Sequence, residues 1–253
     1  MPRDPESESQ RATRQPRDDS DNRRAFFGRR KGHALRAHQA ALFSTLLPKL
    51  ALDLSKPAPS DPRRLFGIAV DEVRLEIGFG GGEHFVAQAL ANPRVGLIGI
   101  EPFVNGMAKA LAAIEQHKLA NVRLSSEDAS RVVNWLPAAN LSRIDLLYPD
   151  PWPKRRHWKR RFVQDESLAR LARLLKPDGE LHFATDIGDY AAWTLARILR
   201  SPDLEWTAER ADDWRTPWPD FVRTRYEAKA VREGRVPHYF TFCKRGGRAS
   251  LRQ

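Results

Sequence analysis

Apolar and polar positions alternate along the chain in a way that distinguishes strands from helices. Short apolar runs, typical of buried strands, occur at residues 73–79, 95–101, 121–125, 144–148 and 180–185, with two further strand-like pieces at 204–208 and 238–243. Helical periodicity is found at about 83–91, in the segment ending near 118, and at 162–175 and 188–199. Strands separated by helix-length segments predict an α/β fold with a doubly wound, mostly parallel sheet.

The N-terminal part of the chain has a different pattern. Residues 1–32 are rich in Arg, Asp, Ser, Pro and Gln and have few apolar anchors, so we expect a disordered basic arm. Residues 33–64 carry the pattern of a short helix that ends near Pro48, followed by a proline-rich linker at 56–62. Residues 65–253 form the predicted α/β domain.

Composition limits the class of protein. The 253 residues are 41% hydrophobic, which is enough for one substantial core, and no apolar run approaches the ~18 residues of a membrane span. The N-terminus has no apolar stretch that could act as a signal peptide, so we expect a cytoplasmic protein without a membrane partner. Cys243 is the one cysteine, which excludes an internal disulfide and a cysteine zinc cage. We expect Cys243 to be a core residue in a strand, we expect no bound metal, and the sequence leaves monomer and homodimer open.

The net charge of +11 is concentrated in one short block. Residues 154–161, Lys-Arg-Arg-His-Trp-Lys-Arg-Arg, contain six Lys or Arg and no acid, whereas residues 1–31 contain nine basic and six acidic residues. Six like charges in eight residues repel one another unless a polyanion neutralises them. We therefore expect the block to bind nucleic-acid phosphates rather than to be only a solvated loop.

A glycine-rich turn, Gly78-Phe79-Gly80-Gly81-Gly82, follows the first predicted strand. Glycines at such a turn let the backbone approach a bound nucleotide. The dinucleotide pattern G-x-G-x-x-G would need glycine where Glu83 stands, and the Gly-Lys-Ser/Thr of a phosphate-binding loop is absent from the sequence here. The carboxylates of Glu76 and Glu83 would repel a pyrophosphate, but they suit the sulfonium and ammonium groups of S-adenosylmethionine.

Acidic residues stand at the ends of three successive strands. Glu76 lies at the end of the first strand, Glu101 closes the second, and Asp128 follows the third. A carboxylate after the second strand can accept hydrogen bonds from both ribose hydroxyls. A carboxylate after the third strand can accept a hydrogen bond from the adenine amino group. A single acid could be a helix N-cap or a loop charge, but three in this arrangement favour a cofactor site.

The fourth strand ends in an acidic turn bounded by prolines, Tyr148-Pro149-Asp150-Pro151-Trp152-Pro153. Pro149 and Pro151 prevent helical continuation and stiffen the turn. Asp150 is therefore expected at the carboxyl end of the strand, facing the cofactor crevice. Trp152 could stack on a flipped base or could pack down on the turn. With the basic block, this turn predicts an enzyme that acts on nucleic acid.

Five segments, taken in order, carry a family resemblance. They are Leu75-Glu76-Ile77-Gly78-Phe79-Gly80, Gly99-Ile100-Glu101, Tyr148-Pro149-Asp150-Pro151-Trp152-Pro153-Lys154, Ala184-Thr185-Asp186 and Thr224-Arg225-Tyr226-Glu227. The chain resembles the tRNA (guanine-N7-)-methyltransferase family over about residues 65–245, although that family has phenylalanine where this chain has Tyr148. The resemblance implies a seven-stranded, Rossmann-like class I methyltransferase fold. It also implies S-adenosyl-L-methionine as methyl donor and a guanine in the variable loop of tRNA as acceptor.

The resemblance further implies roles for individual residues. Asp150 would be the catalytic residue and would also face the cofactor. The other cofactor-binding residues would be Glu76, Gly78, Gly80, Glu101 and Asp128. Substrate contacts would come from Lys154, Asp186, Thr224, Arg225, Tyr226 and Glu227. The RNA would lie against Arg155, Arg156, His157, Trp158, Lys159, Arg160 and Arg161.

The chemistry of guanine N7 agrees with these roles. N7 has an in-plane lone pair, so no base has to remove a proton before N7 attacks a sulfonium methyl. Asp150 and Asp186 are therefore expected to orient the ring and to offset its positive charge.

Three other functions compete with this one. The nearest is methylation of an exocyclic amine of adenine or guanine, because those enzymes place an Asp/Asn-Pro-Pro-aromatic turn at the same strand end. A cytosine-C5 enzyme would need a cysteine nucleophile near the cofactor, and Cys243 is poorly placed for that role. A non-catalytic RNA-binding protein would have no need of acids at three strand ends.

Overall fold

Seven strands form one sheet in the computed structural model, which describes residue 28 and residues 30–246. The strands are β1 (Glu72–Ile77), β2 (Val95–Ile100), β3 (Val122–Ser125), β4 (Leu141–Leu147), β5 (Leu175–Thr185), β6 (Leu204–Trp206) and β7 (His238–Lys244). Their order across the sheet is β3-β2-β1-β4-β5-β7-β6, and β7 runs antiparallel to both of its neighbours. The predicted doubly wound, mostly parallel sheet is confirmed. Most of the predicted arm, residues 1–32, lies outside the described residues.

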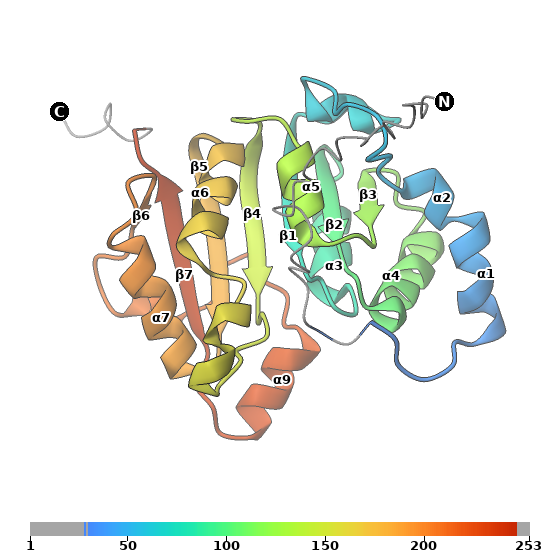
Figure 1. Ribbon diagram of the computed structural model, residues 1–253. Coiled ribbons are helices and arrows are strands. Elements are labelled where there is room, and N and C mark those ends of the chain that lie inside the picture. The colour runs from blue at the N-terminus through green and yellow to red at the C-terminus, as the bar shows by residue number, and fades with distance from the viewer. Residues whose placement is uncertain (1–27, 29, 247–253) are drawn as a thin grey trace, which may run out of the picture.

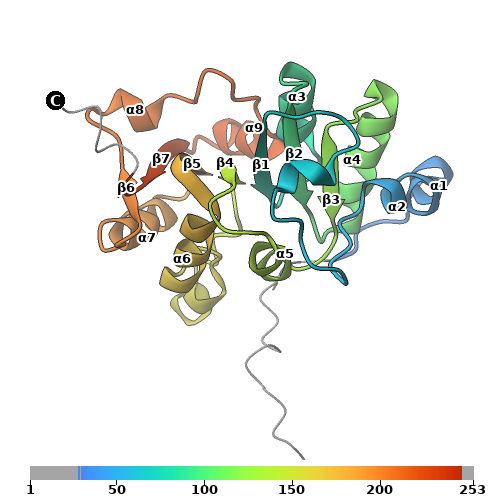
Figure 2. The same cartoon turned by 90° about the horizontal axis from the view of Figure 1, so that it is seen from above.

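Helices cover both faces of the sheet (Figure 1 and Figure 2). On one face lie α5 (Ala129–Trp135), α6 (Asp165–Leu174) and α7 (Gly188–Ile198). On the other lie α3 (Glu83–Ala91), α4 (Val104–His117), α8 (Asp212–Arg215) and α9 (Arg225–Arg232). At the β3 edge, α1 (Ala37–Thr45) packs on α4, and α2 (Leu47–Leu50) packs on β3. Among the described residues, no helix is both long enough and apolar enough to cross a membrane.

Strand β2 shows why the central strands have continuous apolar sequences. All six of its residues are buried, because helices cover both faces of the sheet. Val95 and Leu97 belong to the core cluster under α3 and α4. Ile98 and Ile100 belong to the larger cluster, which also contains residues of α5, α6 and α7. A strand buried on both sides needs apolar residues at every position rather than at alternate ones.

Two local expectations are corrected. The helix predicted to end near Pro48 ends at Thr45, and Pro48 lies in the first turn of α2, where its missing N–H leaves no hydrogen bond unmade. The strand predicted at 180–185 begins earlier, at Leu175, and the segment 176–179 is a bulge inside β5. Asp178 there has a φ of 62°, and the pairing with β4 resumes beyond this segment.

The three short helices α5, α8 and α9 were not predicted from the apolar pattern. Each has eight residues or fewer, which is too short for a clear helical period. The N-terminal ends of α5 and α9 are capped by the side chains of Asp128 and Thr224. Both caps are residues that the sequence marks only as site candidates, so a local structural role accompanies any functional one.

The strand order places a crevice at one edge of the sheet. Strands β2 and β3 lie on one side of β1, whereas β4 and β5 lie on the other. The loops that leave neighbouring strands diverge at such a reversal and open a crevice beyond the carboxyl ends. In Figure 1 this edge is at the bottom, next to α9.

Candidate active site

A cavity of about 600 Å³ lies at the carboxyl ends of the parallel strands. Residues that follow β1, β2, β4 and β5 line it, together with residues of α9 and of the loop before β7. Its lining includes seven of the predicted site residues, Gly78, Glu101, Asp128, Asp150, Arg160, Asp186 and Tyr226. The fold therefore gathers side chains that are far apart in the sequence around one space.

The glycine turn after β1 forms one wall of the cavity. Gly78 has a φ of 72°, which disfavours other residues, and no atom lies within 4 Å of the place where a Cβ would stand. Gly80 has a φ of 60°, and its N–H donates a 2.6 Å hydrogen bond to Oε2 of Glu101. Gly80 does not line the cavity and holds Glu101 by this bond, and a direct cofactor contact by Gly80 stays a prediction.

Glu101 is a buried carboxylate, 6% exposed, at the end of β2. Oε1 accepts a 2.8 Å hydrogen bond from the N–H of Phe103, in addition to the bond between Oε2 and Gly80. Burial raises the pKa of Glu101 to about 7, although both backbone donors favour the charged form. A ligand that donates hydrogen bonds to this carboxylate would stabilise its charge.

Asp128 caps α5 and also lines the cavity. Its Oδ1 accepts hydrogen bonds from the N–H and the hydroxyl of Ser130, at 2.8 and 2.7 Å. No hydrogen bond reaches Oδ2 from the described residues. The N-cap interpretation and the cofactor interpretation are thus compatible, because each can use a different oxygen.

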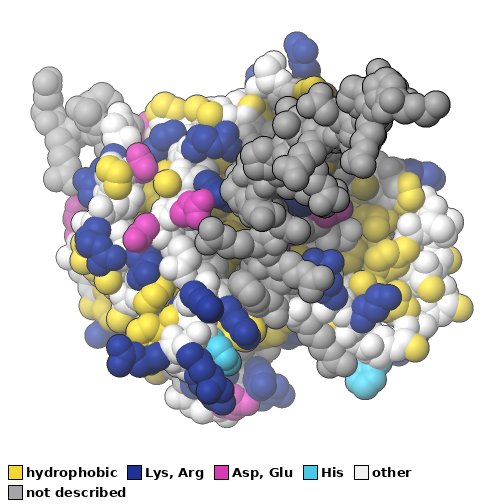
Figure 3. All heavy atoms as spheres, viewed as in Figure 1, with side chains coloured by type: hydrophobic (Ala, Val, Ile, Leu, Met, Phe, Trp, Pro, Cys, Tyr) yellow, Lys and Arg dark blue, Asp and Glu magenta, His cyan; other side chains and the backbone are white. Residues whose placement is uncertain are grey.

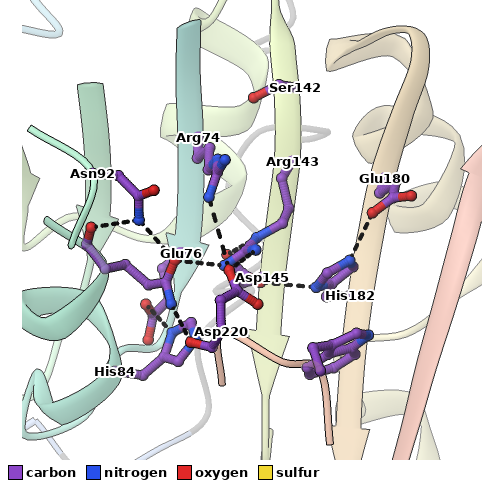
Figure 4. A network of polar contacts seen from close by, with 12 residues as sticks. Arg74, Glu76, His84, Asn92, Ser142, Arg143, Asp145, Glu180, His182 and Asp220 are labelled. Carbon is purple, nitrogen blue, oxygen red and sulfur yellow. Dashed lines mark hydrogen bonds and ion pairs between the residues drawn. The ribbon is translucent and has the colours of Figure 1, made fainter. Parts of the chain in front are cut away.

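Glu76 is not among the residues that line the cavity, although Ile77 and Gly78 are. Its carboxylate is 3% exposed, and Oε2 lies 3.0 Å from Nδ1 of His84 (Figure 4). Burial raises the pKa of Glu76. Burial alone would lower the pKa of His84, but the Glu76 carboxylate outweighs it and raises that pKa. This pair connects the two ends of the glycine turn, and a direct cofactor contact by Glu76 stays a prediction.

A buried network of charges extends from Glu76 across the sheet (Figure 4). Glu76, Asp145 and His182 stand opposite one another on β1, β4 and β5. Arg143 donates to Asp145 at 3.0 Å and to Asp220 at 2.6 Å. Sequence reasoning missed this network. Its one signal is that polar residues alternate along β4, which places 143 and 145 on the same face.

The acidic turn after β4 contains two strained residues. Tyr148 has a φ of 51° and Trp152 a φ of 44°, each immediately before a proline. The left-handed region costs a residue other than glycine roughly 1–2 kcal/mol. Asp150 lines the cavity between them, and burial raises its pKa. Trp152 also lines the cavity, where its ring lies 5.0 Å from the Arg160 guanidinium.

The loop after β5 contributes a second acid to the cavity. Asp186 lines it, and its Oδ2 accepts a 2.5 Å hydrogen bond from Nε of Arg235. Arg235 and Lys229 line the same space, and sequence reasoning missed both cations. They belong to α9 and the loop that follows it, a region without a long apolar run to locate it.

The segment from Thr224 to Glu227 forms the N-cap and first turn of α9. Thr224 Oγ1 accepts a 3.2 Å hydrogen bond from the N–H of Glu227, and Glu227 accepts a 2.6 Å bond from Tyr239. Thr224 and Glu227 are buried and do not line the cavity, and their predicted substrate contact stays a prediction. Tyr226 does line it, and Arg225 lies beside the glycine turn.

The basic block folds as the 3-10 helix η3 (Arg155–Arg160) between β4 and α6. Lys and Arg side chains gather on the lower part of the face seen in Figure 3, over this segment of the chain. Lys154, Arg155, Arg156 and Lys159 are exposed, whereas His157, Trp158 and Arg160 are half-buried. The exposed members are available to a polyanion beside the cavity.

Arg161 departs from the prediction for the block. It is 2% exposed, and its guanidinium lies among the rings of Trp158, Tyr190 and Trp193. Its burial argues against an RNA contact, which stays an untested prediction. A run of like charges in the sequence does not reveal which member faces the core.

The structure also bears on possible metal ligands and on the single cysteine. The part of the chain that the structure describes contains no group of three or more His, Cys, Asp or Glu side chains that could hold a metal ion. Cys243 is 1% exposed in β7, which confirms its prediction as a core residue in a strand.

Comparison with known proteins gives the family. The family model described as "Putative methyltransferase" matches residues 71–239. A tRNA (guanine-N(7)-)-methyltransferase of Nitrobacter hamburgensis is 61% identical over 86% of each chain. The protein of the same name from Rhodopseudomonas palustris (strain BisB18) is 57% identical over 94% of this chain and 93% of its own. That from Bradyrhizobium diazoefficiens is 58% identical over 92% of this chain and 98% of its own. The chain therefore belongs to the tRNA (guanine-N(7)-)-methyltransferase family, which confirms the resemblance found in the sequence.

Proposed function

We propose that this protein transfers a methyl group from S-adenosyl-L-methionine to N7 of a guanine in the variable loop of tRNA. The observation that carries the proposal is that one cavity is lined by four acids and lies beside the basic helix η3. The four acids are Glu101, Asp128, Asp150 and Asp186. The relatives that are about 60% identical and are named tRNA (guanine-N(7)-)-methyltransferase support the same reaction.

The residues after β1, β2 and β3 fit S-adenosyl-L-methionine, which carries an activated methyl on a sulfonium sulfur. Gly78 leaves open space at the wall, so a ligand can approach the backbone closely. The two oxygens of Glu101 each accept one backbone bond and keep lone pairs for ribose hydroxyls. Oδ2 of Asp128 can accept a hydrogen bond from the adenine amino group. A cavity wall with these carboxylates would repel a phosphate but suits a cationic, phosphate-free cofactor.

The acids after β4 and β5 fit the guanine. Asp150 and the Oδ1 atom of Asp186 can accept hydrogen bonds from guanine N1–H and N2–H, because Arg235 occupies only Oδ2. These bonds would hold N7 in line with the methyl and would offset the positive charge that develops on the ring. Asp150 is partly desolvated, which strengthens its electrostatic effect on a bound ring. No proton has to leave N7, so these carboxylates orient and stabilise rather than act as bases.

The exposed cations of η3 support an RNA substrate. Arg155 and Arg156 are exposed, while Arg160 of the same helix lines the cavity and connects it to this surface. Phosphate contacts here would guide the nucleotide whose base enters the cavity.

The test is to incubate the protein with unmodified tRNA and labelled S-adenosyl-L-methionine and to map the product. We expect label in the tRNA and aniline-induced cleavage at a guanine of the variable loop. Label without cleavage would overturn N7 as the acceptor and favour an exocyclic amine of adenine or guanine. RNA binding without any label would contradict methyl transfer and favour a non-catalytic RNA-binding protein.

A further inference from the structure

The last arginine of the basic block lies under the acidic turn. Arg161 Nε donates a 2.7 Å hydrogen bond to the carbonyl oxygen of Pro151, the residue that follows Asp150. We infer that Arg161 is a positioning residue, which holds the turn so that Asp150 faces the cavity in the geometry needed for methyl transfer. This inference rests on the proposed role of Asp150.

The turn needs an anchor from outside because of its composition. Pro149, Pro151 and Pro153 have no N–H, so the turn has few donors with which to bind itself. Its backbone is also strained at Tyr148 and Trp152. A conformation of this kind persists only where surrounding contacts determine it. Those contacts come from the end of the basic block, where Arg161 binds the Pro151 carbonyl and Nε1 of Trp158 donates to the Pro153 carbonyl at 3.3 Å.

The environment of Arg161 is built to keep its charge buried. The guanidinium carbon lies 4.9 Å from the ring centre of Trp158 and 5.0 Å from those of Tyr190 and Trp193. Its Nη2 atom has no hydrogen-bond partner among the described residues. The electron-rich ring faces attract the cation and offset part of its desolvation. Burying a charge costs stability, and an apolar side chain would fill this space without that cost. The hydrogen bond to the Pro151 carbonyl explains why a charged donor, rather than an apolar side chain, occupies this space.

Arg161 also lies between the two segments that carry the acids. Its Nη1 is 3.5 Å from the carbonyl oxygen of Asp189, a long contact, and it packs on Tyr190 in the first turn of α7. That turn of α7 follows Asp186 closely in the chain. Asp150 and Asp186 must both reach one guanine ring, so a side chain in contact with both segments fixes their separation.

Two substitutions of Arg161 and one matched control test the inference. Arg161→Met removes the donors and the charge but keeps an apolar stem, and Arg161→Lys restores one charged donor. The control is Arg197→Met. Arg197 lies over the same Trp193 ring at 3.3 Å, and its polar contacts go to Asp165, Gln164 and the Trp193 carbonyl rather than to the turn.

The rate readout is the single-turnover rate of methyl transfer at saturating cofactor and tRNA. We expect Arg161→Met to lower it between about 10- and 100-fold, because a small displacement of a positioned group is enough for such a loss. We expect tRNA and cofactor affinities within about threefold of wild type, with part of the rate restored in Arg161→Lys and full rate in Arg197→Met. An unchanged rate in Arg161→Met would overturn the inference. So would a loss of tRNA affinity as large as that of Arg155→Ala measured in parallel, which would make Arg161 an RNA contact.

A second readout does not depend on activity. The amides of Tyr148 and His157 are hydrogen-bonded at the two ends of the turn, to the carbonyl oxygens of Ala184 and Lys154. Their hydrogen exchange should be faster in Arg161→Met than in wild type and unchanged in Arg197→Met. Equal protection in all three proteins would contradict the positioning role. If the wild-type protein does not methylate N7, the proposed function fails while the exchange result still shows whether Arg161 holds the turn. If Arg161→Met does not fold, Arg161→Lys carries both measurements.

Discussion

At the scale of single residues, the acids of the cavity are held in different ways. Glu101 is buried and receives two backbone N–H donors, one on each carboxylate oxygen. Asp150 stands on a strained turn and lines the cavity. The first arrangement suits a fixed hydrogen-bond acceptor for the cofactor, and the second suits a carboxylate that faces a changing charge.

Replacing Asp150 tests its electrostatic role. Asp150→Asn keeps the size of the side chain but removes the charge that offsets the developing positive charge on guanine. We expect the single-turnover methylation rate to fall by about 100-fold, the range found when a group that stabilises transition-state charge is removed. The affinity for tRNA, measured by filter binding, should change little. A full methylation rate with unchanged tRNA affinity would show that Asp150 has neither role.

Cofactor binding should release a proton from Glu101. Its pKa is about 7 in the ligand-free protein, so about half of the molecules carry a proton there at pH 7. Ribose hydroxyls donate to the carboxylate and favour its charged form. Binding should therefore release about half a proton at pH 7, measured by calorimetry in two buffers of different ionisation enthalpy. Glu101→Gln should bind the cofactor at least about tenfold more weakly and release no proton.

Glu101 should also make the free energy of unfolding depend on pH in a defined direction. The folded pKa of Glu101 lies above its ordinary 4.5, so the folded protein binds more protons than the unfolded chain between these values. Its contribution to the free energy of unfolding therefore falls as pH rises from about 4.5 to about 7. The stability of wild type minus that of Glu101→Gln should decrease over this range. An increase over this range would contradict the assignment.

At the scale of elements, the carboxyl ends of β1 and β4 depend on the buried charges of Figure 4. Arg143 is 8% exposed and binds Asp145, Asp220 and the side-chain oxygen of Gln88. The loop that carries Asp220 is attached to the sheet by these polar contacts and by the packing of Trp218 and Phe221 on Tyr239.

Removing the central cation of this network should be costly. Arg143→Met would leave Asp145 buried without its partner, and we expect a loss of about 3–5 kcal/mol in the free energy of unfolding. The matched control is Arg74→Met on the neighbouring strand. Arg74 binds the more exposed Glu72 and has only a 4.0 Å contact with Asp220 of the network, so its loss should cost about 1 kcal/mol or less. Chemical denaturation of both variants measures the two losses. Equal losses in the free energy of unfolding would show that the burial of Arg143 does not increase its contribution to stability.

At the scale of the whole molecule, most of the excess positive charge lies on one side of the cavity. Replacing Arg155, Arg156 and Lys159 with Ala should weaken tRNA binding. It should also reduce the slope of log affinity against log salt by roughly 0.7–0.9 for each phosphate that the variant no longer binds. The control replaces Lys56, Arg63 and Arg94, exposed cations that precede β1 and β2 and so lie away from their carboxyl ends. If both triple variants gave the same slope, η3 would not be the RNA-binding surface.

The sequence alone was enough for the strands, the fold class and the family. The strands of a doubly wound sheet are buried on both faces, so they appear as apolar runs whatever surrounds them, as in Val95–Ile100. The turns were visible because glycine and proline restrict the backbone locally, as at Gly78 and Pro149. These properties depend on residues that are close in sequence. The short helices α5 and α9 were missed because their stability comes from caps and tertiary contacts.

Only the tertiary structure decided the environment of each charged side chain. In the sequence, Arg160 and Arg161 are equivalent neighbours. In the fold, one lines the cavity and the other is enclosed by Trp158, Tyr190 and Trp193. Likewise, the place of Glu76 at the end of its strand predicts a cofactor contact, but nothing in the sequence indicates that its carboxylate pairs with His84. The physical reason is that burial and charge pairing depend on residues brought together from distant parts of the chain, whereas backbone preference and apolar pattern are local.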